Sequence, residues 1–138
     1  MSPSSSVDIC IICDGGAKGN PGKGYGSYRL ETNGVKQPVR RLTFGDEVTN
    51  NQAEYWTLIA ALNDVSRLLE KFDYSPQYAR IQLLTDSNLV VNQVAGKWKV
   101  KHHDLRPLVT EAQNALNQFG SWSIDWHSRS NSVKVLGH

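Results

Sequence analysis

The sequence predicts an α/β fold with one mixed sheet, and three features of the chain lead to this prediction. Three apolar or alternating segments, residues 7–14, 25–31 and 35–44, are separated by short turns, which is typical of an antiparallel meander. A long amphipathic helix is then expected over residues 50–72. An apolar strand follows over residues 79–85, and a strand–helix–strand passage of this kind is usually a right-handed parallel crossover.

The composition is that of a single globular domain. Of the 138 residues, 20% are charged and 39% are hydrophobic. No apolar run approaches the ~20 residues that span a membrane. Residues 1–6 are polar, lack the apolar centre of a secretory signal, and are expected to be disordered ahead of one domain at 7–138. We therefore expect a cytoplasmic monomer without a membrane partner.

The first strand ends on a carboxylate. The apolar run 9–13 is bounded by turn residues, which indicates a buried strand, and Asp14 follows it directly. Gly15 and Gly16 allow the backbone to turn sharply and to approach a ligand closely. Ligands of open α/β sheets bind at such strand ends, so Asp14 is a candidate site residue. The alternative is that Asp14 only starts a turn.

Cys10 and Cys13 form a C-x-x-C pattern within this strand. Residues three apart on a strand point to opposite faces, and their Cα atoms would lie ~10 Å apart. That distance is too long for a disulfide, so both are expected to be free thiols.

The second and third strands are expected at residues 25–31 and 35–44, joined by a turn at 32–34. Pro38 lies within the third strand and cannot donate a backbone hydrogen bond. The third strand is therefore expected at an edge of the sheet.

A capping box begins the long helix, because Thr49 and Gln52 can each satisfy a free N–H group of its first turn. The buried stripe, extended back by four residues from Leu58, reaches Glu54. A glutamate on an apolar face is costly unless it is paired or binds a metal. The alternative is a solvated glutamate that complements the helix dipole. The predicted stripe consists of Leu58, Ala61, Val65, Leu68 and Phe72.

The second half of the chain alternates helices and strands. The strand at 79–85 ends on a second carboxylate, Asp86, and a short helix at 87–94 is expected to stop at Gly96. Asp104 is expected to cap a helix that runs to residue 119. Its predicted stripe consists of Leu105, Leu108, Ala112, Leu116 and Phe119.

A fifth strand is expected at residues 122–126, where Trp122, Ile124 and Trp126 alternate with polar residues. Residues 128–131 are expected to form a turn, and a last helix should begin near residue 133.

Three carboxylates are expected to converge. A parallel crossover brings Asp14 and Asp86 to the same end of the sheet, and Glu54 can face them. Such acids repel one another unless cations lie between them, and oxygen ligands suit Mg²⁺ or Mn²⁺. A two-metal carboxylate site is suited to phosphodiester hydrolysis.

A basic segment surrounds Trp98, with Lys97, Lys99, Lys101, His102, His103 and Arg106 inside ten residues. The net charge of +2 is too small to indicate nucleic acid by itself. Mixed aromatic and basic residues nevertheless suit a nucleic-acid strand. The alternative is an ordinary solvated surface.

Three motifs together resemble the type 1 ribonuclease H family in its compact form, without the basic insertion. They are residues 14–22 (DGGAKGNPG), 49–54 (TNNQAE) and 85–87 (TDS). The resemblance implies a five-stranded mixed sheet with helices on both faces. It also implies cleavage of the RNA strand of RNA/DNA hybrids with two Mg²⁺ or Mn²⁺ ions.

The resemblance also implies roles for particular residues. Asp14, Glu54 and Asp86 match the first three catalytic carboxylates, and Asn50 and Asn51 match positions at the minor groove of the hybrid. The residues expected to contact the hybrid are Gly15, Gly16, Asn20, Asn50, Asn51, Trp98, Lys99, Lys101 and Arg129.

The tail departs from the family pattern, which usually supplies a fourth aspartate after the fifth strand. Residues 126–138 contain no acid, and His138 is the nearest candidate for a catalytic metal ligand. The alternative is that His138 is only a frayed chain end.

Other functions are open at this point. The chain is expected to be an active nuclease, and the alternative is a binding module for hybrids that lost turnover with the fourth acid. A nuclease or transposase of the same superfamily is a further alternative, against which Asn50 and Asn51 argue. A P-loop hydrolase is excluded because Gly24 follows Lys23.

Overall fold

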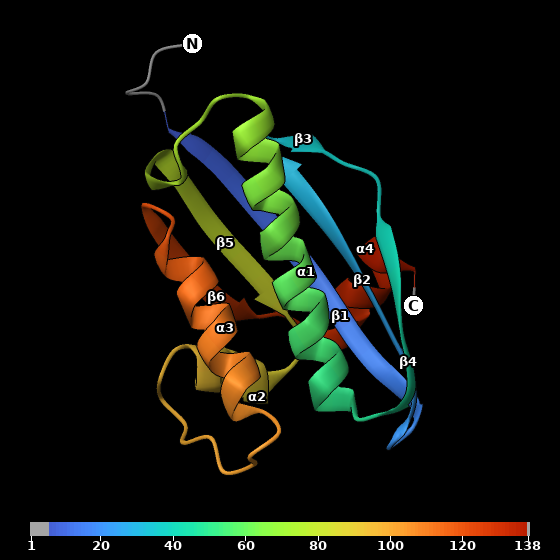
Figure 1. Ribbon diagram of the computed structural model, residues 1–138. Helices are drawn as coiled ribbons and strands as arrows, with labels where there is room; N and C mark the ends of the chain where they lie inside the picture. Colours follow the sequence, from blue (N-terminus) through green and yellow to red (C-terminus); the bar gives the residue numbers. More distant parts are fainter. Residues whose placement is uncertain (1–5, 138) are drawn as a thin grey trace.

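The computed structural model describes residues 6–137 and contains one mixed sheet (Figure 1). The strands are β1 (Val7–Gly19), β2 (Gly22–Thr32), β3 (Val35–Lys36), β4 (Arg40–Val48), β5 (Ala79–Thr85) and β6 (Ser121–Trp126). Their order is β3-β2-β1-β5-β6, and β4 also pairs with β2. β2 is antiparallel to β1, β3 and β4, while β1–β5 and β5–β6 are parallel pairs. The predicted fold class and the parallel crossover are confirmed.

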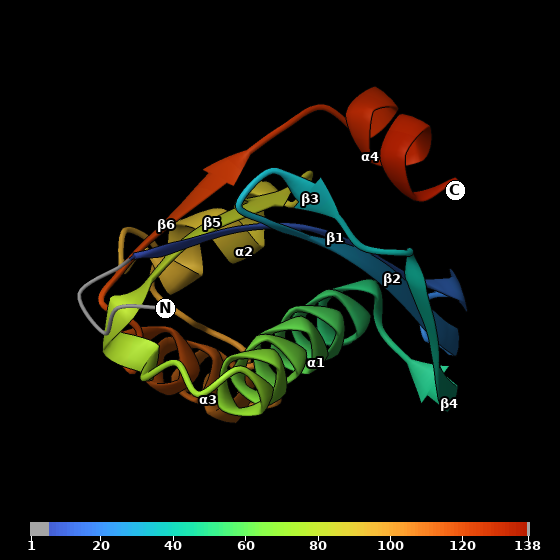
Figure 2. The same cartoon turned by 90° about the horizontal axis from the view of Figure 1, so that it is seen from above.

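Helices cover both faces of the sheet. They are α1 (Asn50–Lys71), η1 (a 3₁₀ turn, Pro76–Tyr78), α2 (Asn88–Val94), α3 (Arg106–Asn117) and α4 (Arg129–Leu136). Figure 2 shows α1 and α3 on one face and α4 on the other. Within residues 6–137, no helix combines the length and the apolar character needed to cross a bilayer.

The core lies between the sheet and α1. Alternate residues of β1 and β5, such as Ile11 and Leu83, belong to the same buried hydrophobic cluster as Leu58 and Leu62 of α1. Cys10 and Cys13 are both free thiols, as predicted.

The third predicted strand is divided into β3 and β4, so the sheet has six strands rather than five. The break includes Pro38, which cannot donate a ladder hydrogen bond. Both pieces pair with β2 alone, which confirms their position at the edge.

The sharp turn predicted at Gly15 and Gly16 is wrong. β1 continues through both residues to Gly19, because each has an antiparallel partner in β2, Gly26 and Tyr25 respectively. The chain reverses at 20–21 instead, between the ends of the two strands.

Helix α1 begins as predicted, with the reciprocal Thr49–Gln52 capping box. Its predicted buried stripe is wrong at the C-terminal end, where Phe72 is 60% exposed and Leu69 is buried instead. The predicted stripe alternates steps of three and four residues, a mean of about 3.5, which falls behind the 3.6 residues per turn of an α-helix. The buried face therefore moves to Leu62, Val65 and Leu69.

Helix α2 ends before Gly96, as predicted, and Gly96 has a left-handed conformation. Ser87, predicted as the first residue of this helix, is its N-cap. The cap predicted for α3 is wrong, because its N-cap residue is Leu105 and no side chain caps it. Leu105 is buried, and a proline in the first turn favours that start.

The C-terminal segment also differs from the prediction. α4 begins at Arg129, and Ser128 caps it by accepting from Asn131 N, so the predicted turn at 128–131 is wrong. Trp126, the last residue of β6, is 52% exposed.

Candidate active site

Asp14, Glu54 and Asp86 come together as the sequence predicted. β1 and β5 run parallel with Ile12 opposite Leu84, so their acids emerge at the same end of the sheet. Glu54, in the first turns of α1, completes the group. One ligand atom of each acid lies within 4.8 Å of the others. We refer to these three residues as the acid cluster.

Two glycines allow α1 to lie this close to β1. A Cβ added to Gly15 would lie 2.5 Å from Ala53 O, the backbone oxygen that directly precedes Glu54. Gly26, the cross-strand partner of Gly15, leaves space that the Thr57 side chain occupies. The glycines beside Asp14 therefore bring Glu54 within reach of the strand end.

The start of α1 is also tied to the β1–β2 connection. Asn50 N donates to Asn20 Oδ1 at 3.1 Å, and Ala17 N donates to Asn50 Oδ1 at 2.8 Å. Asn20 and Asn50, both predicted to contact nucleic acid, thus hold the helix start beside the acid cluster. Whether they also contact a hybrid stays a prediction.

Asp14 is 6% exposed, and its pKa is raised to about 6. Burial is the largest cause, and the nearby charge of Asp86 and a hydrogen bond with it act in the same direction. Arg129 and the Gly15 backbone oppose this shift. A hydrogen bond between two carboxyl groups needs a proton on one of them, which is why this contact raises the pKa of Asp14.

The pKa of Glu54 is raised to about 7, again mainly by burial. A hydrogen bond from Ser87 opposes the rise, the charges of Asp14 and Asp86 add to it, and Arg129 opposes it. Glu54 Oε2 and Asp86 Oδ2 are buried without a hydrogen-bond partner. Such unpartnered oxygens are costly unless a cation or water binds them.

The acid cluster therefore fits a hard divalent cation. Its donors are carboxylate oxygens, the ligands that Mg²⁺ and Mn²⁺ prefer. The neighbouring Cys13 thiol is no ligand, because burial and the three acids raise its pKa and keep it protonated.

Three residues near the cluster were not singled out from the sequence. Ser87 bonds Glu54, as given above, and stands within the TDS motif that the sequence analysis quoted. Trp126 Nε1 donates to the backbone oxygen of Asp86 at 3.1 Å. His127 N donates to Thr85 O at 3.0 Å, and burial lowers the pKa of its imidazole. The sequence could have indicated Trp126 and His127 through their position at the end of the strand that neighbours the strand of Asp86.

His138 lies outside the described residues, and its role stays a prediction.

The basic segment forms an open groove at the end of α2. Trp98 is 48% exposed in it. The groove, of about 510 Å³, is lined by Leu89, Gln93, Lys97, Trp98, Lys99, Lys101 and His102. His102 also borders a smaller hollow of about 260 Å³ with Asn20 and Asn51. Most of the predicted nucleic-acid residues are thereby brought onto neighbouring surfaces, while Arg129 stands apart from them on α4.

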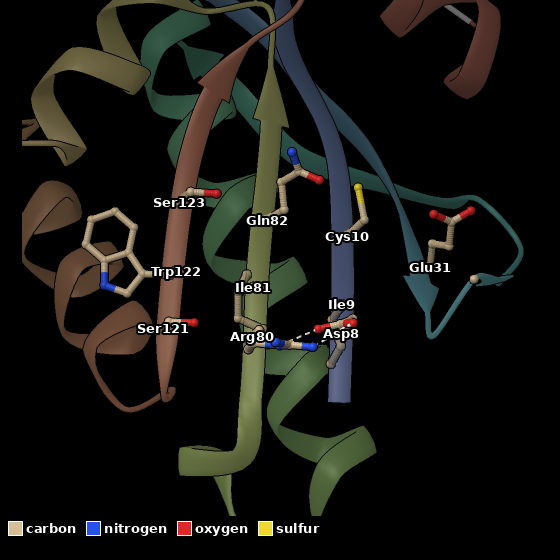
Figure 3. A pocket seen from close by; sticks show the side chains of 11 residues that line it. Asp8, Ile9, Cys10, Glu31, Arg80, Ile81, Gln82, Ser121, Trp122 and Ser123 are labelled. Carbon is tan, nitrogen blue, oxygen red and sulfur yellow. Dashed lines mark hydrogen bonds and ion pairs between the residues drawn. The ribbon is translucent and has the colours of Figure 1, made fainter. Parts of the chain in front are cut away.

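Another hollow of about 510 Å³ lies at the opposite end of the sheet, where β5 begins (Figure 3). Arg80 is its main cation, but its guanidinium already binds Asp8 through two hydrogen bonds of 2.6 and 3.0 Å. This hollow contains none of the acid cluster, so we do not regard it as the active site.

Comparison with known proteins identifies the family. A family model described as reverse transcriptase-like matches residues 13–135. Bifunctional protein Rv2228c of Mycobacterium tuberculosis is 37% identical over 134 residues, which cover 92% of this chain and 33% of that protein. Ribonuclease HI of Halobacterium salinarum is 37% identical over 136 residues, which cover 98% of this chain and 64% of that protein. The chain belongs to the ribonuclease H family.

The fold agrees with solved ribonuclease H structures. LC11-RNase H1, crystallised in complex with an RNA/DNA hybrid, superposes with a TM-score of 0.79 at 26% identity, covering 91% of this chain and 89% of that one. The compact form of the family, expected from the motifs, is confirmed. The chain spans about a third (33%) of the length of the Rv2228c protein.

Proposed function

We propose that this ribonuclease H family member hydrolyses the RNA strand of RNA/DNA hybrids with two Mg²⁺ or Mn²⁺ ions. The observation that carries the proposal is the acid cluster, whose ligand atoms lie within 4.8 Å of one another and include buried unpartnered oxygens. The hybrid bound to LC11-RNase H1 supports the substrate class.

In this proposal Asp14, Glu54 and Asp86 hold the ions. Bound ions would activate water and stabilise the leaving oxygen of the phosphodiester. The chain's own contribution is to fix the acids. Ser87 orients Glu54 by a hydrogen bond, and Trp126 anchors the backbone of Asp86.

The hybrid would lie across the cluster and the basic groove. Gly15 and Gly16 directly follow Asp14, and Asn20 lies at the start of α1. Asn50 and Asn51 would contact the minor groove, where 2′-hydroxyls are sensed. Two surface properties support binding of the DNA strand at the groove. They are the exposed ring of Trp98 and the exposed ammonium groups of Lys99 and Lys101.

A second candidate function is a hybrid-binding module with impaired turnover. One observation favours it, because residues 127–137 contain no acid and Arg129 stands near the cluster instead. The three retained acids favour the enzyme. We also propose a cytoplasmic location, with which the free thiols of Cys10 and Cys13 are compatible.

The test is cleavage of a hybrid labelled on its RNA strand, with Mg²⁺ or Mn²⁺, by the parent and by Asp14→Asn. We expect the variant to lose activity by more than about 100-fold, since even outer-shell partners of metal ligands typically cost 10- to 100-fold. A variant rate within about tenfold of the parent would contradict the assignment. Hybrid binding in Ca²⁺ without cleavage by the parent in either metal would favour the binding module.

A further inference from the structure

The basic groove has a buried polar side chain among its lining residues. Gln93, on α2, is only 5% exposed and lines the groove together with Leu89, one helical turn before it. The lysines of the groove, by contrast, are exposed. A polar side chain is costly to bury unless its donors and acceptors are bonded, so the partners of the Gln93 amide are informative.

The amide of Gln93 is held by α1. Tyr55 Oη donates to Gln93 Oε1 at 2.8 Å, and the Tyr55 side chain is fully buried. The amide oxygen is thereby occupied, and the two N–H groups of the amide point away from Tyr55. Gln93 therefore presents its donors, rather than its acceptor, to the groove.

These donors have no partner in the described part of the protein. Within residues 6–137, Gln93 Nε2 makes no hydrogen bond. It is nevertheless not one of the unpartnered side-chain atoms that are closed off from solvent in those residues. The nitrogen is therefore accessible, and the groove is the hollow that Gln93 lines.

Cations surround this donor. Three exposed lysines line the groove with it, namely Lys97, Lys99 and Lys101. Lys97 N and Trp98 N both donate to Asn92 O, at 2.8 and 3.1 Å, so this wall of the groove is fixed to the residue next to Gln93. The wall belongs to the loop that leads from α2 to α3 (Figure 1). An oriented donor beside several cations suits an oxyanion, which only accepts hydrogen bonds.

We infer that the Gln93 amide donates a hydrogen bond to a phosphate oxygen of the DNA strand, and that Tyr55 holds the amide in the orientation that this contact needs. The inference rests on the proposed function, which assigns the DNA strand to this groove. It makes Gln93 a binding residue that neither the charge nor the aromatic content of the basic segment indicated, and it makes Tyr55 a positioning residue.

The test is binding of an RNA/DNA hybrid in Ca²⁺ by the parent and by Gln93→Met, a variant of similar length that has no donor. We expect the variant to bind roughly tenfold more weakly, as for the loss of one hydrogen bond to a charged group. The slope of log K against log salt should stay that of the parent, because an amide carries no charge and releases no counter-ion. This separates Gln93 from the lysines, whose removal lowers the slope.

A methylphosphonate scan identifies the phosphate. Each hybrid carries one DNA linkage in which a methyl group replaces a charged phosphate oxygen. At one linkage the affinity should fall several-fold more in the parent than in Gln93→Met, because both changes remove the same hydrogen bond. Coupling of this kind at a linkage of the RNA strand instead would overturn the assignment to the DNA strand.

Two further variants separate binding from folding, and urea unfolding gives the stability of each. Tyr55→Phe keeps the groove residues and removes only the hydroxyl that holds the amide, so it should weaken binding by about threefold even if Gln93→Met folds poorly. Gln113→Met is the matched control. Gln113 Nε2 donates to Val94 O at 3.2 Å, at the end of α2 and outside the groove, so this variant should bind the hybrid as the parent does.

The outcomes separate the inference from the proposed function. Equal hybrid affinities for the parent and Gln93→Met would overturn the role of Gln93, and so would equal losses in Gln93→Met and Gln113→Met. A parent protein that binds no hybrid in Ca²⁺ would overturn the proposed function, and the inference with it.

Discussion

Asp14 and Glu54 are unusual acids at the scale of single residues, because folding makes both weaker. The pKa of Asp14 rises from 3.8 to about 6, and the pKa of Glu54 rises from 4.5 to about 7. Burial is the first cause in each case. This cost arises at a site where a cation can offset it, which is typical of a functional site.

These shifts predict how stability depends on pH in the metal-free protein. The folded pKa values lie above the unfolded ones, so between pH about 4 and 7 the folded state binds more protons than the unfolded state. The free energy of unfolding should therefore fall as pH rises through this window, by on the order of 3 kcal/mol for each group.

Asp14→Asn tests this dependence, because an amide neither ionises nor repels Glu54 and Asp86. Urea unfolding should be measured in EDTA at pH 4.5, 6 and 7.5. The free energy of unfolding of the variant should increase relative to that of the parent as pH rises. Excess Mg²⁺ at pH 7.5 should stabilise the parent and not the variant. If the free energy of unfolding of the two proteins depended on pH in the same way, Asp14 would not be destabilised by the charges of its neighbours.

At the scale of elements, the site depends on how closely α1 lies against β1. The capping box and the Asn20–Asn50 hydrogen bond fix the helix start, and Gly15 removes the side chain that would separate helix and strand. At the other end of the site, α2 contacts α1 twice, through Ser87 to Glu54 and through Tyr55 Oη, which donates to Gln93 Oε1 at 2.8 Å.

Gly15→Ala should therefore loosen the acid cluster. Its new Cβ would lie 2.5 Å from Ala53 O, so α1 must shift, at a cost of roughly 1–3 kcal/mol in stability. Metal affinity should fall several-fold because Glu54 moves with the helix.

The matched control is Gly34→Ala, at the far end of the sheet. Gly34 has φ +84 and no atom within 4 Å of an added Cβ, so this change strains only the backbone. Both variants should be less stable in urea, and only Gly15→Ala should bind Mn²⁺ more weakly. Equal metal affinity in the two variants would remove the role assigned to Gly15.

At the scale of the whole molecule, the acid cluster and the basic groove lie at the two ends of α2. Asp86 and Ser87 directly precede the helix, while Lys97, Trp98 and Lys99 follow it. A nucleic-acid strand in the groove and a scissile phosphate at the cluster can thus be held by one short rigid element.

Lys99→Ala should weaken hybrid binding in Ca²⁺ and flatten its dependence on salt. Loss of one phosphate contact lowers the slope of log K against log salt by about 0.7 to 0.9. Trp98→Ala should lose roughly 1–3 kcal/mol of binding free energy with little change in that slope, because stacking involves no counter-ion. Single-turnover cleavage of the bound complex should be nearly unchanged in both variants.

Lys36→Ala is the control for the lysine change, since Lys36 is exposed on β3, away from the groove. Its affinity and salt slope should match those of the parent. A Lys99→Ala slope equal to that of Lys36→Ala would identify Lys99 as an ordinary solvated lysine.

The sequence by itself determined the order of the elements and the identity of the acids. The apolar run before Asp14, the Thr49–Gln52 box and the strand before Asp86 are local signals, because capping and alternation depend on neighbours within a few residues. The parallel crossover then required the two aspartates to share one end of the sheet.

Only the tertiary structure decided what depends on contacts between distant segments. β1 passes Gly15 because β2 pairs with it. The raised pKa values of Asp14 and Glu54 arise from burial and from charges on other elements. Such effects act through space, and no spacing along the chain encodes them.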